Sequence, residues 1–393
     1  MWPVAPPPDA REARSRSAIR SPARRRAIIA LAVPPPLFDL ICRGCGAPYP
    51  PAGLPATCAC GGFWVYRHGA LGWRPPAPAT GLQRWAGIYG LGARELPDRE
   101  LGEPPARYGG VQVTRQGSAP AGSFKERGAE VLVAACVRRG VERVFLDSSG
   151  NAGLAVARAC SARGIACQVL VPAATPDAKR RAIADWGAEV VAIAGDREAT
   201  HLAARRLAAD LPYASHILQP FFLAGVASLA WDLDWPEREP PRDRDPEAGG
   251  GSARRHWLLP AGNGSLLLGV ALGLEVLGRA GRLACSPALH AVQLCGFASL
   301  APEGSGEPPA AAPRAAGIAI ADPPRRAEML AALRHSGGDV TPVSDAAVAE
   351  AAAELAAAGL KTDPTGGAAW AGWRARRDLP AADTLVVLTS REA

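Results

Sequence analysis

The sequence predicts an α/β protein in which parallel strands alternate with helices. From about residue 108, short apolar runs of strand length alternate with amphipathic runs of helical length. Small-residue turns, "SSGNAG" at 148–153 and "PAGNGS" at 260–265, stand between a strand and a helix. Since strands joined by helices form parallel, doubly wound sheets, we expect two α/β lobes with a cleft between them.

The first part of this region predicts four strand–helix units. The expected strands are 110–116, 141–149, 165–173 and 188–195, and the expected helices are 124–140, 151–164, 175–187 and 196–211. We expect residues 129–223 to form the smaller lobe, inserted in the larger one.

The second part follows a charged, proline- and glycine-rich break at 235–255, which predicts a flexible insertion. The expected strands are 256–262, 288–296, 339–344 and 384–390, and the expected helices are 263–281, 323–337, 345–359 and 366–377.

The formal charge of +7 lies mainly in residues 1–36, which hold seven arginines against two acidic residues. This segment is rich in proline and has little periodicity, so we expect a disordered basic tail. The rest is nearly neutral and lacks a stripe of basic and aromatic residues, which argues against a nucleic-acid-binding protein. The apolar run "AIIALAV" is followed by prolines rather than a cleavage site, and no run approaches the ~18 apolar residues of a membrane span. We therefore expect a cytoplasmic protein with no nucleic-acid or membrane partner.

Four of the nine cysteines cluster in the stretch "CRGCGAPYPPAGLPATCACGG". They form two short pairs, Cys42 with Cys45 and Cys58 with Cys60, and such pairs can supply four thiolates to a tetrahedral zinc ion. The alternatives are four free thiols in a loop or a disulfide pair. We expect residues 37–70 to form a zinc-ribbon-like segment, with a structural role because four cysteines leave no open position for water.

Lys125 stands out because only three of the 44 lysine and arginine residues are lysines. It lies in "AGSFKERGA", where a predicted helix begins, and two glycine-rich turns accompany it. A glycine-rich turn that enters a helix offers N–H groups to an anion. Pyridoxal phosphate carries such an anion, and its aldehyde needs a primary amine, which arginine lacks. We interpret Lys179 as a surface charge and His216 as a packed or surface histidine.

The motifs "SFKERG", "SSGNAG", "PAGNG" and a C-terminal "LT", in this order and spacing, resemble those of the fold-type II pyridoxal phosphate enzymes. With the cysteine-rich segment in front, residues 38–390 most resemble threonine synthases. The resemblance implies a two-lobed α/β fold with parallel sheets, preceded by a small zinc ribbon, with residues 71–393 as the catalytic core.

The resemblance also assigns roles to individual residues. Lys125 would join covalently to the cofactor and later carry protons. The remaining cofactor contacts would be Asn151 at the ring hydroxyl, Gly262, Asn263, Gly264 and Ser265 at the phosphate, and Thr389 at the ring nitrogen. The substrate carboxylate would lie near Ser148, Ser149 and Gly150. A hydroxyl at the ring nitrogen keeps that nitrogen largely unprotonated, which favours elimination and replacement over transamination.

The activity implied is that of a lyase that converts O-phosphohomoserine and water to threonine and phosphate, with an amino acid as its small-molecule substrate and a homodimer as its assembly. Two departures concern the substrate. Phe221 and Phe222 stand where threonine synthases often carry a basic residue, and "GVASL" replaces "GxKT". The alternative is a weakened or divergent paralogue, similar to threonine/serine dehydratases or cysteate synthases, that does not bind a phosphorylated substrate. We expect poor use of O-phosphohomoserine unless another arginine reaches the site.

Overall fold

The computed structural model describes residues 39–67, 71–74, 76–118, 122–234, 255–283, 285–302, 308 and 312–392. The expected tail at 1–36, and all of the expected insertion except residue 255, lie outside these residues. The described residues belong to one compact unit, in which the described strands make sheets of six, three and two strands.

The six-stranded sheet has the order β10-β9-β8-β11-β4-β3 and is parallel except where β3 pairs with β4. Its strands are β3 (Ala106–Tyr108), β4 (Val111–Arg115), β8 (His256–Pro260), β9 (Ala288–Leu294), β10 (Val340–Val343) and β11 (Thr384–Leu388). In β11, Val386 lies opposite Val113 of β4 on one side and opposite Leu258 of β8 on the other. The carboxyl ends of β4, β11 and β8 therefore lie next to one another at one edge of the sheet.

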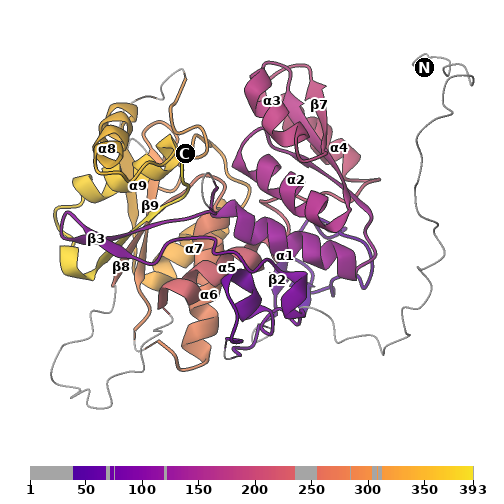
Figure 1. Cartoon of the computed structure of the whole chain (residues 1–393), viewed down its shortest axis with the longest axis horizontal. Helices are drawn as coiled ribbons and strands as arrows, with labels where there is room; N and C mark the ends of the chain where they lie inside the picture. The colour runs from indigo at the N-terminus through magenta and orange to yellow at the C-terminus, as the bar shows by residue number, and fades with distance from the viewer. Residues whose placement is uncertain are drawn as a thin grey trace, which may run out of the picture. The chain divides into compact units, whose positions relative to one another are not determined.

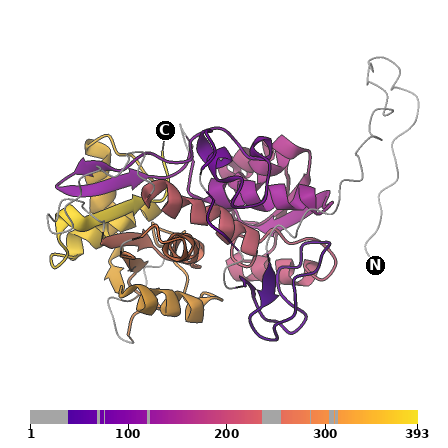
Figure 2. The same cartoon turned by 90° about the horizontal axis from the view of Figure 1, so that it is seen from below.

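Helices cover both faces of this sheet, so successive residues of a strand are buried against different helices. Leu385 and Val387 of β11 pack in one apolar cluster with residues of α5 and α6, and Val386 and Leu388 pack in another with residues of α8 and α9. These helices and α7, which Figures 1 and 2 show, are α5 (Pro220–Asp234), α6 (Ser265–Arg279), α7 (Arg326–Ser336), α8 (Asp345–Ala357) and α9 (Pro364–Ala375).

The three-stranded sheet has the order β5-β6-β7 and is parallel throughout. Its strands and the helices around it, grouped together in Figure 1, are β5 (Arg143–Asp147), α2 (Asn151–Arg163), β6 (Ala166–Pro172), α3 (Asp177–Ala184), β7 (Glu189–Ile193) and α4 (Arg197–Leu207). Helix α1 (Lys125–Arg138) leads into this sheet from β4 and packs against both α2 and α5. The predicted α/β fold with parallel sheets is confirmed, while the predicted lobe and domain boundaries stay predictions.

The N-terminal part of the described chain forms a small antiparallel ribbon of β1 (Leu40–Cys42) and β2 (Trp64–Tyr66). It packs on the start of α5, where the Tyr66 hydroxyl donates to the Pro220 carbonyl oxygen at 2.9 Å. Arg43 forms an ion pair with Glu328 of α7 at 2.9 Å. The short 3₁₀ helices are Gly81–Trp85, Ala93–Glu95 and Ala381–Asp383.

Helix α5 has no amphipathic pattern by which the sequence could indicate it. Its residues "PFFLAGVASLAWDLD" are apolar around the whole helix, because it is buried between α1 and α6. The contact with α1 is close enough to exclude side chains. A Cβ atom at Gly225 would overlap the Arg127 carbonyl group and lie 2.8 Å from the Gly128 Cα atom.

We expect Gly225→Ala to lower the free energy of unfolding by about 1–3 kcal/mol, because the added methyl group forces α1 and α5 apart. Chemical denaturation measures this change. Gly278→Ala in α6 is the matched control, since a Cβ atom there has no neighbour within 4 Å. An equal loss of stability in both variants would contradict the close α1–α5 contact.

Candidate active site

Lys125 is the first residue of α1, and main-chain contacts hold it beside the end of β11. The Phe124 N–H donates to the Thr389 carbonyl oxygen at 3.0 Å. Ser123 and Ser390 pair in an isolated antiparallel bridge. The lysine therefore lies where β4 and β11 end.

The surroundings of the Lys125 amine disfavour its charged form. The side chain is half-buried. Nζ also lies 4.2 Å from the centroid of the Phe124 ring, a contact that by itself favours the cation and that burial outweighs. Burial lowers the pKa of Lys125 from 10.5 to about 8, with Asp363 opposing this shift and Arg197 adding to it. A large fraction is thus neutral amine near pH 8, and the neutral amine is the form that attacks an aldehyde.

The turn after β8 brings main chain rather than side chains to this region. Gly264 has a φ of +88° and directly precedes α6. A Cβ atom at Gly264 would lie 2.5 Å from Met329 Sδ, and one at Gly262 would lie 2.6 Å from the Gly317 carbonyl oxygen. Glycine is therefore required at both positions, and the N-terminal N–H groups of α6, which have no partner within the helix, suit an anion.

The turn after β5 forms the N-terminus of α2. Asp147, the last residue of β5, accepts hydrogen bonds from the Tyr213 hydroxyl and from His201 Nδ1, the latter at 3.0 Å. These contacts fix the start of the turn, in which the Gly150 N–H donates to Ser148 Oγ at 3.4 Å. The following N–H groups lie at the positive end of the α2 dipole and can bind a carboxylate.

The Thr389 hydroxyl group directly follows β11. Thr389 is only 3% exposed, and its Oγ1 atom has no hydrogen-bond partner among the described residues. Leaving a buried hydroxyl unpaired costs free energy, so this atom marks a position where a bound molecule can supply the partner.

All the predicted cofactor and substrate residues line one cavity of about 590 Å³, within the usual range for a small-molecule site. They are Lys125, Ser148, Ser149, Gly150, Asn151, Gly262, Asn263, Gly264, Ser265 and Thr389.

The cavity is also lined by side chains that no sequence motif indicated. Arg197, Arg314 and Asp363 are among them, and so is Lys179, which is exposed. His216 is buried in the wall, where burial and, to a smaller extent, Lys125 lower the pKa of its ring to about 3. His216 is therefore neutral near neutral pH.

Phe221 and Phe222, in contrast, belong to the core and are not among the residues that line the cavity. Phe221 packs edge-to-face on Tyr49 of the ribbon, with ring centroids 5.5 Å apart. Phe222 packs so closely on α1 that a Cβ atom at Gly128 would lie 2.5 Å from its ring. Their lack of charge therefore does not decide whether the cavity can bind a phosphate.

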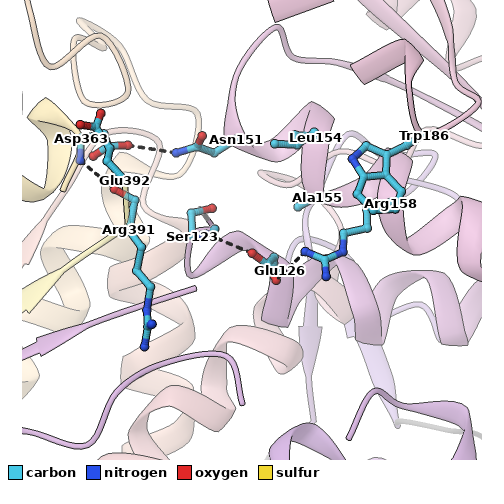
Figure 3. A pocket seen from close by; sticks show the side chains of 12 residues that line it. Ser123, Glu126, Asn151, Leu154, Ala155, Arg158, Trp186, Asp363, Arg391 and Glu392 are labelled. Atoms are coloured by element: carbon cyan, nitrogen blue, oxygen red, sulfur yellow. Dashed lines mark hydrogen bonds and ion pairs between the residues drawn. The ribbon is translucent and has the colours of Figure 1, made fainter. Parts of the chain in front are cut away.

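A second cavity, of about 490 Å³, shares Asn151, Leu154, Asp363 and Glu392 with the first. Figure 3 shows Asn151 of α2 pointing toward Asp363, to which its Nδ2 atom donates at 3.0 Å. Asp363 also caps α9, because its Oδ1 atom accepts from the Gly366 N–H at 2.8 Å. This carboxylate thus links a helix beside the small sheet to one on the large sheet.

The four predicted metal ligands also lie together, in the ribbon. The Sγ atoms of Cys42, Cys45, Cys58 and Cys60 all lie within 4.8 Å of one another. The Cys42–Cys60 and Cys45–Cys58 Sγ distances are 3.4 and 3.7 Å. A backbone hydrogen bond from Cys45 is the main cause that lowers the pKa of Cys42 to about 6, which favours the thiolate. This cluster can hold a metal ion.

Comparison with known proteins identifies the family to which these features belong. Residues 106–390 match the model of the pyridoxal-phosphate dependent enzymes. The chain belongs to this family. The predicted resemblance to the fold-type II pyridoxal phosphate enzymes is confirmed.

Relatives within the family differ in activity. The threonine synthase of Synechocystis sp. is 29% identical over 289 residues, which cover 71% of this chain and 70% of the relative. The structure of maize serine racemase matches with a TM-score of 0.56 at 19% identity, covering 72% of this chain and 84% of the other. The structure of a threonine deaminase from T.th. matches with a TM-score of 0.53 at 24% identity, covering 72% and 88%. At these identities the two structures show a shared fold, not a shared substrate.

Among the described residues, no helix is both long enough and apolar enough to cross a membrane. The cytoplasmic location and the homodimer stay predictions.

Proposed function

We propose that this pyridoxal-phosphate dependent enzyme is a lyase that eliminates or replaces a side-chain substituent of an amino acid. The proposed reaction converts O-phosphohomoserine and water to threonine and phosphate. The observation that carries the proposal is the unpaired Thr389 hydroxyl beside Lys125, because a hydroxyl at the cofactor's ring nitrogen favours elimination and replacement. The similarity to the Synechocystis threonine synthase supports this substrate.

The residues present fit the cofactor. The turn at Gly262–Ser265 excludes side chains at Gly262 and Gly264 and suits a phosphate, and Lys125 offers a primary amine in the same cavity. Thr389 Oγ1 is a buried polar atom in need of a partner. Pyridoxal phosphate supplies an aldehyde for the amine and a conjugated ring that takes up the electron pair left when a substrate bond breaks.

The chain's own residues would then bind the substrate and move its protons. The N-terminus of α2, with Ser148, Ser149 and Gly150, would hold the substrate carboxylate and so fix the amino acid in the cavity. A Lys125 pKa of about 8 suits an amine that takes up and returns protons near neutral pH. Asn151 would contact the cofactor's ring hydroxyl.

The second candidate is dehydration of serine or threonine, and the His216 wall favours it. The wall is uncharged at His216, because the His216 ring is neutral. Phe222, which does not line the cavity, packs edge-to-face against this ring, with ring centroids 6.0 Å apart. An uncharged wall suits a small hydroxyl side chain better than a phosphate dianion.

We expect the cofactor-loaded protein to be yellow and to release phosphate from O-phosphohomoserine faster than ammonia from serine or threonine. Borohydride reduction should fix the cofactor to the peptide that contains Lys125, which mass spectrometry can distinguish from those of the other two lysines. Lys125→Arg keeps the charge but lacks the amine, so it should lose both the colour and at least about 10³-fold in activity.

Lys361→Arg is the matched control and should keep both properties, since Lys361 is exposed and does not line the cavity. Ammonia release without phosphate release would establish the dehydratase candidate instead. Retention of colour by Lys125→Arg would contradict the assignment of Lys125.

We also propose that the cysteine cluster binds one structural zinc ion. Zn–S bonds of about 2.3 Å in a tetrahedron place sulfur atoms about 3.8 Å apart, close to the Cys42–Cys60 and Cys45–Cys58 Sγ distances of 3.4 and 3.7 Å. A Cβ atom at Gly62 would lie 2.5 Å from Cys42 Sγ, so the main chain is fitted closely around the thiols.

Metal analysis should find about one zinc ion per chain. Cys42→Ser should lose it and lower the free energy of unfolding, while the cofactor's absorbance band remains, because the ribbon lies apart from the lysine cavity. Cys285→Ser, which changes an exposed thiol outside the cluster, should keep the metal. Wild-type protein with four titratable thiols in the ribbon and no metal would rule the zinc site out.

A further inference from the structure

Arg197 lines the lysine cavity, and its guanidinium has no hydrogen bond or ion pair within the described part of the chain. It is the first residue of α4, directly after Asp196, whose side chain caps the helix by accepting from the Ala199 N–H at 3.0 Å. Burial lowers the pKa of Arg197, although Asp147 opposes this shift. The Arg197 residue as a whole is exposed, so its donors reach solvent at the cavity and are free to bind a ligand.

The position of this arginine is not explained by the helix that carries it. The first turn of a helix is the positive end of its dipole, where a cation is unfavourable and an acidic residue is preferred. Asp196 and Glu198, the neighbours of Arg197, follow that preference. An arginine between them opposes helix stability, which points to a role in the cavity.

Of the three carboxylates that line the cavity, Asp147, Asp363 and Glu392, the first two are already engaged. Asp147 accepts from Tyr213 and His201, and Asp363 accepts from Asn151 and the Gly366 N–H. The planar guanidinium group of Arg197 thus remains available for a ligand. Such a group binds phosphates and carboxylates through two parallel hydrogen bonds.

The distance between the N-terminus of α2 and the N-terminus of α4 suits a substrate with a charge at each end. Helix α2 follows β5 and α4 follows β7, and β6 lies between these strands. Two strand spacings separate the starts of the two helices by roughly 10 Å. An amino acid with its carboxylate at α2 and an extended arginine reaching back from α4 can together bridge that distance.

We propose that Arg197 binds the anionic end of the substrate's side chain and so selects amino acids with a phosphorylated side chain. This inference rests on the proposed function, in which α2 holds the substrate carboxylate. Arg197 would thus provide the positive charge for the substrate phosphate that Phe221 and Phe222 cannot provide.

Steady-state kinetics of cofactor-loaded Arg197→Gln test this role. We expect the KM for O-phosphohomoserine to rise roughly 10- to 100-fold, as for the loss of a charge-assisted contact. The kcat/KM for serine or threonine should change much less, since Arg197 acts on those substrates only through the pKa of Lys125. Arg197→Lys keeps the charge but not the planar guanidinium group, so the rise should be smaller. Arg206→Gln, in the last turn of the same helix and outside the cavity, is the matched control and should behave as wild type.

Titration of the loaded protein with inorganic phosphate, followed by calorimetry, separates this inference from the proposed function. If wild type does not use O-phosphohomoserine, the proposed reaction fails, yet phosphate binding that is at least tenfold weaker in Arg197→Gln still supports the subsite. Equal phosphate binding and equal KM in the variant and wild type would overturn it. An equal loss of activity toward phosphorylated and unphosphorylated substrates would overturn it as well.

Discussion

The parallel alignment of β4, β11 and β8 is the constraint from which the lysine cavity follows. Adjacent parallel strands end at the same edge of a sheet, and the chain places a different chemical group after each of the three ends. Lys125 follows β4, Thr389 follows β11, and the Gly262–Ser265 turn follows β8. The hydrogen bond from the Phe124 N–H to the Thr389 carbonyl oxygen then fixes the start of α1 against β11. An amine, a hydroxyl with no partner among the described residues and an anion-binding turn thus line one cavity.

The small sheet supplies the other wall and part of the charge. Its strands β5 and β7 lead into helices whose N-termini present the Ser148–Gly150 turn and Arg197. Desolvation of Lys125 and the nearby Arg197 charge both lower the pKa of the amine, and Asp363 limits that effect. Asp363 also accepts a hydrogen bond from Asn151, so the same carboxylate tunes the lysine and joins the two walls. The electrostatics of the cavity therefore depend on how the small sheet is held against the large one.

Local sequence patterns predicted the parts of this site that depend on local structure. The glycine turns, the lysine before a helix and the paired cysteines are short motifs with fixed backbone requirements, and the structure brings each set together. The sequence patterns did not indicate Arg197 and Asp363 as site residues, because locally each one only begins or caps a helix. Tertiary folding alone brings them to the cavity. Helix α5 was not predicted, because a helix buried on all sides lacks the apolar stripe that indicates a helix in a sequence. Phe221 seemed to belong to the substrate site, but its partner is Tyr49, 172 positions earlier in the numbering of the chain.

The central claim is that the meeting of these strand ends makes the Lys125 amine reactive near neutral pH. The most direct measurement is the pH dependence of amine labelling at Lys125 in cofactor-free protein, followed by mass spectrometry of its peptide. Neutral amine increases as pH rises through the pKa, so half-maximal labelling should occur near pH 8 in the folded protein and near the ordinary value of 10.5 in the unfolded chain. Half-maximal labelling at the same pH in both states would contradict the account.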